Sequence, residues 1–262
     1  MMKKAVIVVS FGTAVERARQ EEIGAVEHYL RQQVSDCPMV SAYTSPTIRK
    51  ILAKRGIQIP SLEEAMEKLA EQRVQFLYVL PTHLLPGYEY DKIQESLMDY
   101  GHRFEQIVYA QPLMANTQQV QQLAQVLIEH IPRREGEMTV LLGHGSEHQG
   151  NLVYPALQGV LHLAGRTDLL VGTVEGYPDF EAVFSVLQRE QPKQITLLPL
   201  MLVAGTHAIE DMAGEQKDSW KSQLEQAGFA VKAVFQGLGA LPEIQQLYAD
   251  RLKHLMDSEH GI

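Results

Sequence analysis

The sequence has little cysteine and no cluster of basic residues, and each absence excludes a class of site. Its 262 residues include one cysteine, Cys37, which excludes an intramolecular disulfide and a zinc site built on several cysteines. The 23 lysine and arginine residues are outnumbered by 32 acidic residues, and the formal net charge is -9. Because binding to a phosphate backbone needs clustered lysine and arginine, we expect no nucleic-acid partner.

Long hydrophobic runs and the common nucleotide and hydrolase motifs are also absent. The apolar run at residues 5–9 follows two lysines, but it is shorter than the hydrophobic region of a secretory signal. No stretch approaches the roughly 18 apolar residues that a membrane span needs. The G-x-G-x-x-G, Walker, H-E-x-x-H and G-x-S-x-G motifs do not occur. We therefore expect a soluble, cytoplasmic protein with no membrane partner and no nucleotide cofactor.

The sequence does show short apolar runs that alternate with longer stretches of helical periodicity. Residues 15–34 place apolar side chains on one helical face, and Ser61 with Glu64 fits a capping box that opens another helix. This alternation predicts parallel sheets that are covered by helices on both faces. The predicted strands are residues 5–9, 40–43, 76–80, 107–110, 138–142, 169–174, 195–198 and 231–235.

Three segments of the first half recur in the same order in the second half. Residues 10–13, 44–45 and 80–89 correspond to residues 143–146, 175–176 and 198–207. We therefore predict an α/β protein of two similar domains, each a four-stranded parallel sheet flanked by helices, with an active-site cleft between them. The predicted ranges are 1–130 for the amino-terminal domain, 131–240 for the carboxyl-terminal domain with the metal site, and 241–262 for a final helix. One arrangement packs this final helix on the first domain.

Candidate ligands for a metal ion follow three predicted strands of the second domain. His144, Glu175 and His207 each come where a strand ends, and ligands of parallel sheets bind beyond those ends. Imidazole and carboxylate suit divalent cobalt, nickel, zinc or iron, and an imidazole can also accept a proton. Each residue has an ordinary alternative: a loop histidine is usually a surface residue, and an acid at a helix start satisfies backbone donors.

The corresponding positions of the first half carry different chemistry. Phe11 takes the place of His144, Thr44 takes the place of Glu175, and Glu89 takes the place of His207. The first half therefore offers mainly apolar and hydroxyl contacts. This asymmetry suits a flat apolar ligand with a polar centre. The turn that includes Ser10 and Thr13 is either an anion site or a capped strand-to-helix turn. His83 is either a strand cap or a residue that faces the cleft.

The segments that carry these residues also carry a family resemblance along essentially the whole chain. The sequence resembles the anaerobic, class II cobalt chelatases of the CbiK type, which act on sirohydrochlorin in early cobalamin synthesis. The matching segments are residues 8–13, 44–45 with 48–50, 87 with 89–90, 143–145, 174–175 with 177–178, 198–211 and 218–221.

The resemblance implies a lyase that inserts the substrate metal Co²⁺ into sirohydrochlorin without ATP. It implies a metal site at His144, Glu175 and His207, with His144 as the proton acceptor. Departures at Gly176 and at residues 214–217 bear on substrate selectivity alone. The residues that we expect to contact the tetrapyrrole are Ser10, Phe11, Thr13, Ser45 and Glu89.

Several alternatives stay open at this point. Iron insertion into sirohydrochlorin or a porphyrin needs the same fold and ligand types, and a non-catalytic carrier of tetrapyrrole or metal needs the same histidines. A periplasmic binding protein ranks last, because an export signal and long crossover linkers are missing. The physiological metal is undecided, and so is the oligomeric state, for which a homo-oligomer is one option.

Overall fold

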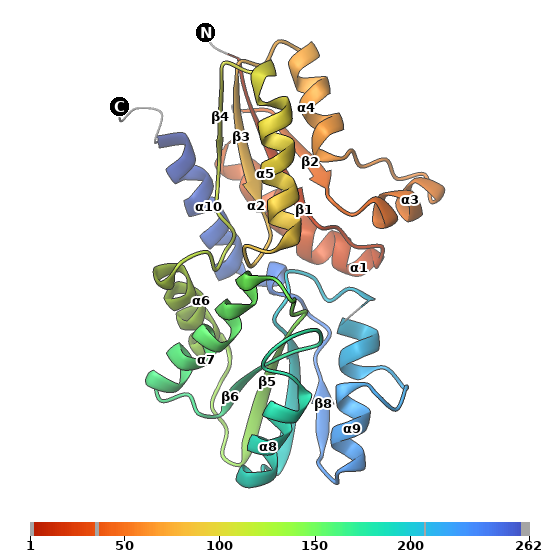
Figure 1. The fold of residues 1–262 in the computed structure, drawn as a ribbon, viewed down its shortest axis with the longest axis vertical. Coiled ribbons are helices and arrows are strands. Elements are labelled where there is room, and N and C mark those ends of the chain that lie inside the picture. Colours follow the sequence, from red (N-terminus) through yellow and green to blue (C-terminus); the bar gives the residue numbers. More distant parts are fainter. Residues whose placement is uncertain (1–2, 35–36, 207, 258–262) are drawn as a thin grey trace. The chain divides into compact units, whose positions relative to one another are not determined.

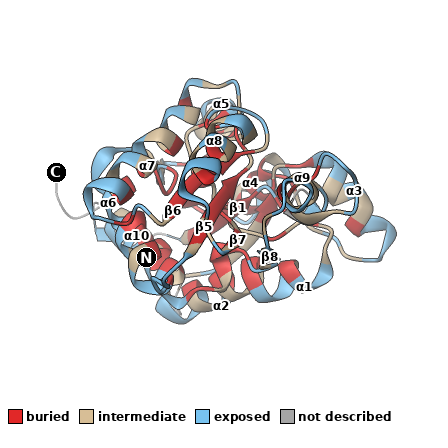
Figure 2. Ribbon diagram, turned by 90° about the horizontal axis from the view of Figure 1, so that it is seen from below, coloured by how far each residue is buried: buried red, intermediate tan, exposed pale blue. Residues whose placement is uncertain are grey.

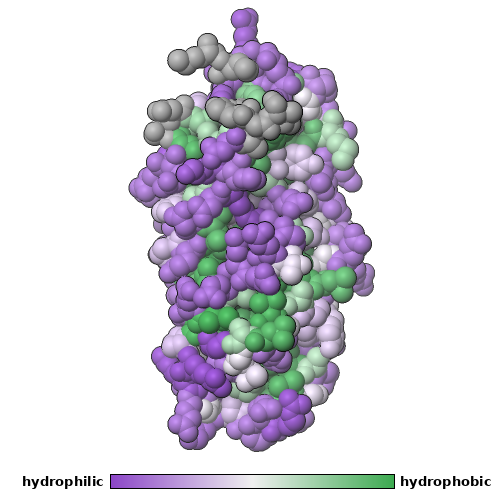
Figure 3. All heavy atoms as spheres, turned by 90° about the vertical axis from the view of Figure 1, so that its left-hand side faces the viewer, coloured by the Kyte–Doolittle hydropathy of each residue, from purple (hydrophilic) through white to green (hydrophobic). Residues whose placement is uncertain are grey.

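The chain folds into two compact α/β units. The computed structural model describes residues 3–34, 37–206 and 208–257 (Figure 1). One unit comprises Met1–Leu113 together with Gly239–Ile262, and the other comprises Met114–Leu238. Within the described residues, no helix is long and apolar enough to cross a membrane. Figure 2 shows that buried residues gather along the strands, and Figure 3 shows hydrophobic patches among hydrophilic side chains on one face.

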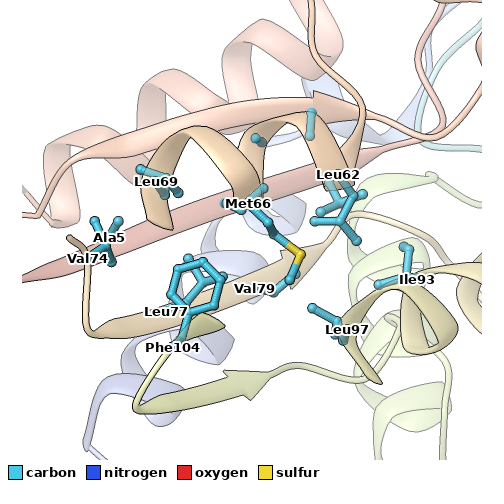
Figure 4. Packing of buried hydrophobic residues seen from close by; sticks show 14 residues of the cluster. Ala5, Leu62, Met66, Leu69, Val74, Leu77, Val79, Ile93, Leu97 and Phe104 are labelled. Atoms are coloured by element: carbon cyan, nitrogen blue, oxygen red, sulfur yellow. The ribbon is translucent and has the colours of Figure 1, made fainter. Parts of the chain in front are cut away.

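The first unit is built on a parallel sheet of order β2-β1-β3-β4. Residues 5–9 alternate between its two faces, so that Ala5, Ile7 and Val9 pack with α4 and α5 in one core cluster (Figure 4). Helices α2 and α10 pack together, and α10 also contacts β3. The strands are β1 (Lys4–Ser10), β2 (Met39–Tyr43), β3 (Phe76–Pro81) and β4 (Gln106–Tyr109); the helices are α1 (Glu16–Ala18), π-helical η1 (Arg19–Ile23), α2 (Gly24–Gln33), α3 (Pro46–Lys54), α4 (Leu62–Glu71), α5 (Tyr88–Tyr100), η2 (Gly101–Arg103), η5 (Leu238–Ala240) and α10 (Pro242–Asp257).

The second unit repeats this plan with a parallel sheet of order β6-β5-β7-β8. Trp220 of α9 and Phe180 of α8 meet edge to face over one core cluster, with ring centroids 5.1 Å apart. The strands are β5 (Glu137–Gly143), β6 (Leu169–Thr173), β7 (Gln194–Pro199) and β8 (Val231–Ala233); the helices are α6 (Thr117–His130), η3 (Gln149–Leu152), α7 (Val153–Leu163), α8 (Phe180–Glu190), η4 (Ala208–Met212) and α9 (Trp220–Gln226).

Most of the predicted elements are confirmed. All eight predicted strands are present, and the two four-stranded parallel sheets are as expected. The capping box is formed: the Glu64 N–H donates to Ser61 Oγ at 3.2 Å, and the Ser61 N–H donates to Glu64 Oε2 at 2.6 Å. The stretch predicted as one helix from 15 to 34 instead contains a π-helical turn between α1 and α2.

The division into units differs from the predicted one at residue 130. Helix α6 belongs to the second unit, where it packs on α7. The buried guanidinium of Arg166 holds the end of α6 in place, donating to the carbonyl oxygens of Ile128 and Ile131 at 2.9 Å each. The final helix, α10, belongs to the first unit. Helical periodicity shows which face of α6 is buried, but it does not identify the sheet against which that face packs.

Matched hydrogen bonds show that the two units repeat each other in detail. After β1 the Val15 N–H donates to Thr13 Oγ1 at 3.2 Å, and after β5 the His148 N–H donates to Ser146 Oγ at 3.0 Å. The glycine between strand and hydroxyl has a positive φ in both turns, 96° at Gly12 and 81° at Gly145. These matched turns support the duplication that the sequence suggested.

Candidate functional site

The turn after β5 is built to bring His144 to the end of the sheet. Gly145 has a positive φ, and a Cβ at this position would collide with the carbonyl oxygen of Glu175. A Cβ at Gly143 would collide with the ring of Tyr154, which is itself buried. Both glycines are therefore required by close contacts. The tight turn leaves the His144 side chain about two-fifths exposed, at 41%.

Two of the three predicted metal ligands lie together. His144 Nδ1 is 3.8 Å from Glu175 Oε2, and the Glu175 N–H donates to the His144 carbonyl oxygen at 2.7 Å. His144 Nδ1 also lies 3.1 Å from the carbonyl oxygen of Gly145. A carbonyl oxygen only accepts hydrogen bonds, so this contact favours the tautomer with the proton on Nδ1. In that tautomer Nε2 carries the lone pair that binds a metal ion or accepts a proton.

A hydrogen-bonded frame ties the loop after β5 to the loop after β6. Asn151 Oδ1 accepts from the Ser146 N–H at 3.0 Å, and Asn151 Nδ2 donates to the Tyr177 carbonyl oxygen at 2.7 Å. Burial raises the pKa of Tyr154 to about 12, so its hydroxyl stays neutral. This hydroxyl accepts a hydrogen bond from the Gly145 N–H at 3.5 Å. His148 Nδ1 accepts from the Gly150 N–H at 2.9 Å, which gives this histidine a capping role at η3. The frame fixes the backbone on which His144 and Glu175 stand.

The third predicted ligand, His207, lies outside the described residues. Among the residues that the structure describes, no group of three or more His, Cys, Asp or Glu side chains is placed to hold a metal ion. The loop that leads to position 207 repeats its counterpart in the first unit. The Ile209 N–H donates to the Gly205 carbonyl oxygen at 3.1 Å, as the Asp91 N–H does to the Gly87 carbonyl oxygen at 3.1 Å.

The hydrogen-bond register corrects one of the predicted correspondences between the halves. The Ser45 N–H donates to the Phe11 carbonyl oxygen at 3.2 Å, as the Glu175 N–H does to the His144 carbonyl oxygen. Phe11 therefore corresponds to His144 as expected, but Ser45, and not Thr44, corresponds to Glu175. A shift of one residue was invisible in the sequence because the two loops share no identical residue at these positions.

The three hydroxyl residues predicted to contact substrate are buried in the first unit. Ser10 Oγ accepts from Thr82 Oγ1 at 2.8 Å, and Ser45 Oγ caps α3 by accepting from the Ile48 N–H at 3.4 Å. Thr13 Oγ1 accepts from a backbone N–H in its own turn. Each hydroxyl thus has a structural role in this edge of the sheet.

The two other predicted contact residues are accessible at the same edge. Phe11 is 45% exposed directly after β1, and Glu89 lies in the first turn of α5, partly exposed. An exposed aromatic side chain occurs at the corresponding edge of the second unit too, where Tyr177 follows β6. Aromatic surface beside polar groups suits a flat, apolar ligand with a polar centre.

Comparison with known proteins decides the family. The model of the family described as "Cobalt chelatase (CbiK)" matches residues 4–257. The chain belongs to this family of cobalt chelatases. The resemblance noted in the sequence is thereby confirmed.

Relatives and solved structures agree with this assignment. The chelatase is 34% identical to the sirohydrochlorin cobaltochelatase of Salmonella typhimurium over 258 residues, which cover 98% of this chain and 97% of the relative. It is 28% identical to the sirohydrochlorin cobaltochelatase CbiKC of Nitratidesulfovibrio vulgaris, over 96% of this chain and 90% of the relative. The solved structure of SirB from Bacillus subtilis with Fe³⁺ shares the fold with a TM-score of 0.68 at 18% identity, over 99% of this chain and 98% of SirB.

One further polar residue of this chelatase is His83, for which the sequence left two interpretations open, a strand cap or a residue that faces the cleft. His83 follows β3, and both of its ring nitrogens are buried without a hydrogen-bond partner. Burial lowers the pKa of His83 to about 4, against the opposing effect of the nearby Glu89 carboxylate. The ring is therefore neutral at neutral pH. The sequence feature that could have identified His83 as buried is its position just beyond β3, a strand whose residues are all buried.

The depressed pKa of His83 predicts a loss of stability in mild acid. The unfolded chain binds a proton here near pH 6.5, whereas the folded chain does not until about pH 4, so stability falls as the pH drops through that window. Between pH 7 and pH 5 the expected loss is about 2 kcal/mol of unfolding free energy. Urea unfolding followed by circular dichroism should show this loss in the wild type and much less of it in His83→Phe. Equal losses in the two proteins would contradict the prediction.

Proposed function

We propose that this cobalt chelatase inserts Co²⁺ into sirohydrochlorin in the cytoplasm, without ATP. The main structural support is the pair of His144 and Glu175 at the carboxyl ends of β5 and β6, where His144 Nδ1 lies 3.8 Å from Glu175 Oε2. The names of the relatives, which are sirohydrochlorin cobaltochelatases, support the substrate and the metal. The absence of a phosphate-binding motif from the sequence is consistent with independence from ATP.

The chemistry requires both a metal ligand and a proton acceptor. Each insertion replaces two pyrrole N–H bonds with metal–nitrogen bonds, and two protons leave as the dication enters. In the tautomer that the Gly145 carbonyl oxygen favours, the lone pair on His144 Nε2 accepts one of these protons or contacts the metal first. The Glu175 carboxylate, whose side chain is 65% exposed, balances the charge of the metal and passes protons to solvent. The family resemblance adds His207 as a further ligand.

Protein groups also hold the two reacting side chains in position. The contact of Nδ1 with the Gly145 carbonyl oxygen orients the His144 ring, and the Asn151 bridge fixes the loops that carry both residues. Such positioning lowers the cost of bringing metal and macrocycle together in a reactive arrangement.

Turnover measured under anaerobic conditions tests the proposal. Purified protein is mixed with sirohydrochlorin and Co²⁺, Fe²⁺ or Ni²⁺, and the visible absorption change is compared with the rate of the enzyme-free reaction. We expect many turnovers per protein molecule, fastest with Co²⁺. Binding at one equivalent without acceleration would identify a carrier instead, and a faster reaction with Fe²⁺ would identify an iron chelatase.

A further inference from the structure

The outer face of α7 is apolar, although it lies on the surface of the second unit (Figure 1). Leu152 and Leu163, at the two ends of the helix, are 71% and 92% exposed, and Ala156 and Gly159 between them are exposed too. Spacings of four, three and four residues place these four residues in one stripe along the helix, the α7 stripe. Figure 3 views this side and shows hydrophobic side chains gathered on the second unit.

The corresponding helix of the first unit shows that the fold does not require an apolar surface at this place. Helix α2 connects the first two strands of its unit as α7 does, and α2 packs on α10 as α7 packs on α6. The exposed residues of α2 are all polar, namely His28, Arg31, Gln32 and Gln33. A surface helix without a partner normally exposes residues of this kind. The apolar face of α7 therefore indicates a surface that a partner covers.

The lack of charge around the α7 stripe selects the kind of partner. The two longest runs of the sequence without Asp, Glu, Lys or Arg are residues 106–128 and 148–165, which include most of α6 and all of α7. The exposed residues of α6 before Glu129 are threonine and glutamine. A partner with a strongly charged surface would find no opposite charge on this face. A second copy of the chain, with its formal net charge of -9, meets the least repulsion there.

The order of residues in the α7 stripe is also self-complementary. When two copies of α7 cross antiparallel about a twofold axis at the level of positions 157 and 158, Leu152 lies opposite position 163 of the second copy. Ala156 then lies opposite position 159. The small pair at the centre lets the two helices approach closely, and a leucine pair covers each end. We propose that the α7 stripe is the contact face of a twofold dimer of this chain.

The neighbouring edge of the sheet is less suited to contact between copies. Strand β6 lies at the edge of its sheet, and Gln158, on the inner side of α7, binds two of its backbone groups. Gln158 Nε2 donates to the Leu169 carbonyl oxygen at 3.0 Å, and Gln158 Oε1 accepts from the Val171 N–H at 2.6 Å. These bonds occupy groups through which a strand of another copy would pair. Contact through the outer face of α7 requires no such bond to break.

The short length of the stripe predicts a weak dimer. About 17 Å of helix covers less than the roughly 800 Å² per copy of a standard interface, so we expect a dissociation constant on the order of 10 µM. Sedimentation equilibrium of the wild type at rising concentration should show the 29.4 kDa monomer and then twice that mass. Leu163→Glu, which places a carboxylate in the contact twice, should weaken association at least about 50-fold. Met98→Glu, the matched control at a 75% exposed position of α5, should leave association unchanged.

A paired substitution tests the twofold register. Leu152→Glu alone should prevent association as Leu163→Glu does. The double variant Leu152→Glu with Leu163→Lys should associate about tenfold more tightly at low salt than either glutamate variant, because the register sets the two opposite charges side by side. Circular dichroism of each variant confirms that the fold is retained.

The outcomes decide the proposal without reference to the reaction. A dimer that Leu163→Glu dissociates and that the double variant partly restores would uphold the α7 stripe as the contact face. A wild type that remains at 29.4 kDa at every concentration would overturn it. An oligomer that survives Leu163→Glu would show that the copies meet elsewhere. A double variant no tighter than the single glutamate variants would refute the twofold register.

Discussion

Replacement of His144 by alanine should lower the rate of cobalt insertion at least about 100-fold, which is the scale of a lost proton acceptor. The side chain is 41% exposed at the end of β5 and contributes little to the core. The fold should therefore survive, with unchanged circular dichroism and a free energy of unfolding within about 0.5 kcal/mol of the wild type. Initial rates with sirohydrochlorin and saturating Co²⁺ measure the effect.

A second histidine of the same unit provides the matched control. His162 is exposed on α7, away from the loops after β5 and β6, so His162→Ala should turn over at the wild-type rate. Wild-type turnover by His144→Ala would refute the role assigned to His144. A loss of activity accompanied by unfolding would show instead that the side chain supports the turn.

The sequence predicted well those features that depend on local pattern. The eight strands appear as short apolar runs, and the central strands β1, β3 and β5 are largely buried because parallel strands are covered on both faces. His144 and Glu175 were predicted to meet because the ends of adjacent parallel strands lie at one edge, and the structure places them 3.8 Å apart. The capping box was recognisable because its two hydrogen bonds connect residues three apart.

The features that sequence reasoning missed depend on contacts between distant segments. Helix α6 joined the second unit because Arg166, far along the chain, binds the carbonyl oxygens at its end. The correspondence of Ser45 with Glu175 follows from backbone bonds across the sheet. The unpaired nitrogens of His83 follow from burial by surrounding residues, and no local pattern records burial of one ring. In each case the deciding partner is distant in the chain.

Replacement of Gly145 by alanine should damage both stability and activity. The alanine would have to keep the positive φ of 81° at this position, and its Cβ would collide with the Glu175 carbonyl oxygen. Strain and overpacking together should cost about 3 kcal/mol of unfolding free energy. Because the collision displaces the backbone that carries Glu175, the insertion rate should also fall about 100-fold. Urea unfolding followed by fluorescence of Trp220, the sole tryptophan and a residue of the same unit, measures the first effect.

Two other glycines of the unit separate the strain from the collision. Gly165 has a similar φ of 78°, but a Cβ there meets nothing within 4 Å, so Gly165→Ala should cost about 1 kcal/mol and leave turnover unchanged. Gly159 lies within α7 and is also open, so Gly159→Ala should stabilise the unit by up to about 1 kcal/mol. If Gly145→Ala behaved like Gly165→Ala in both measurements, the close approach of the two loops would have no role in placing Glu175 beside His144.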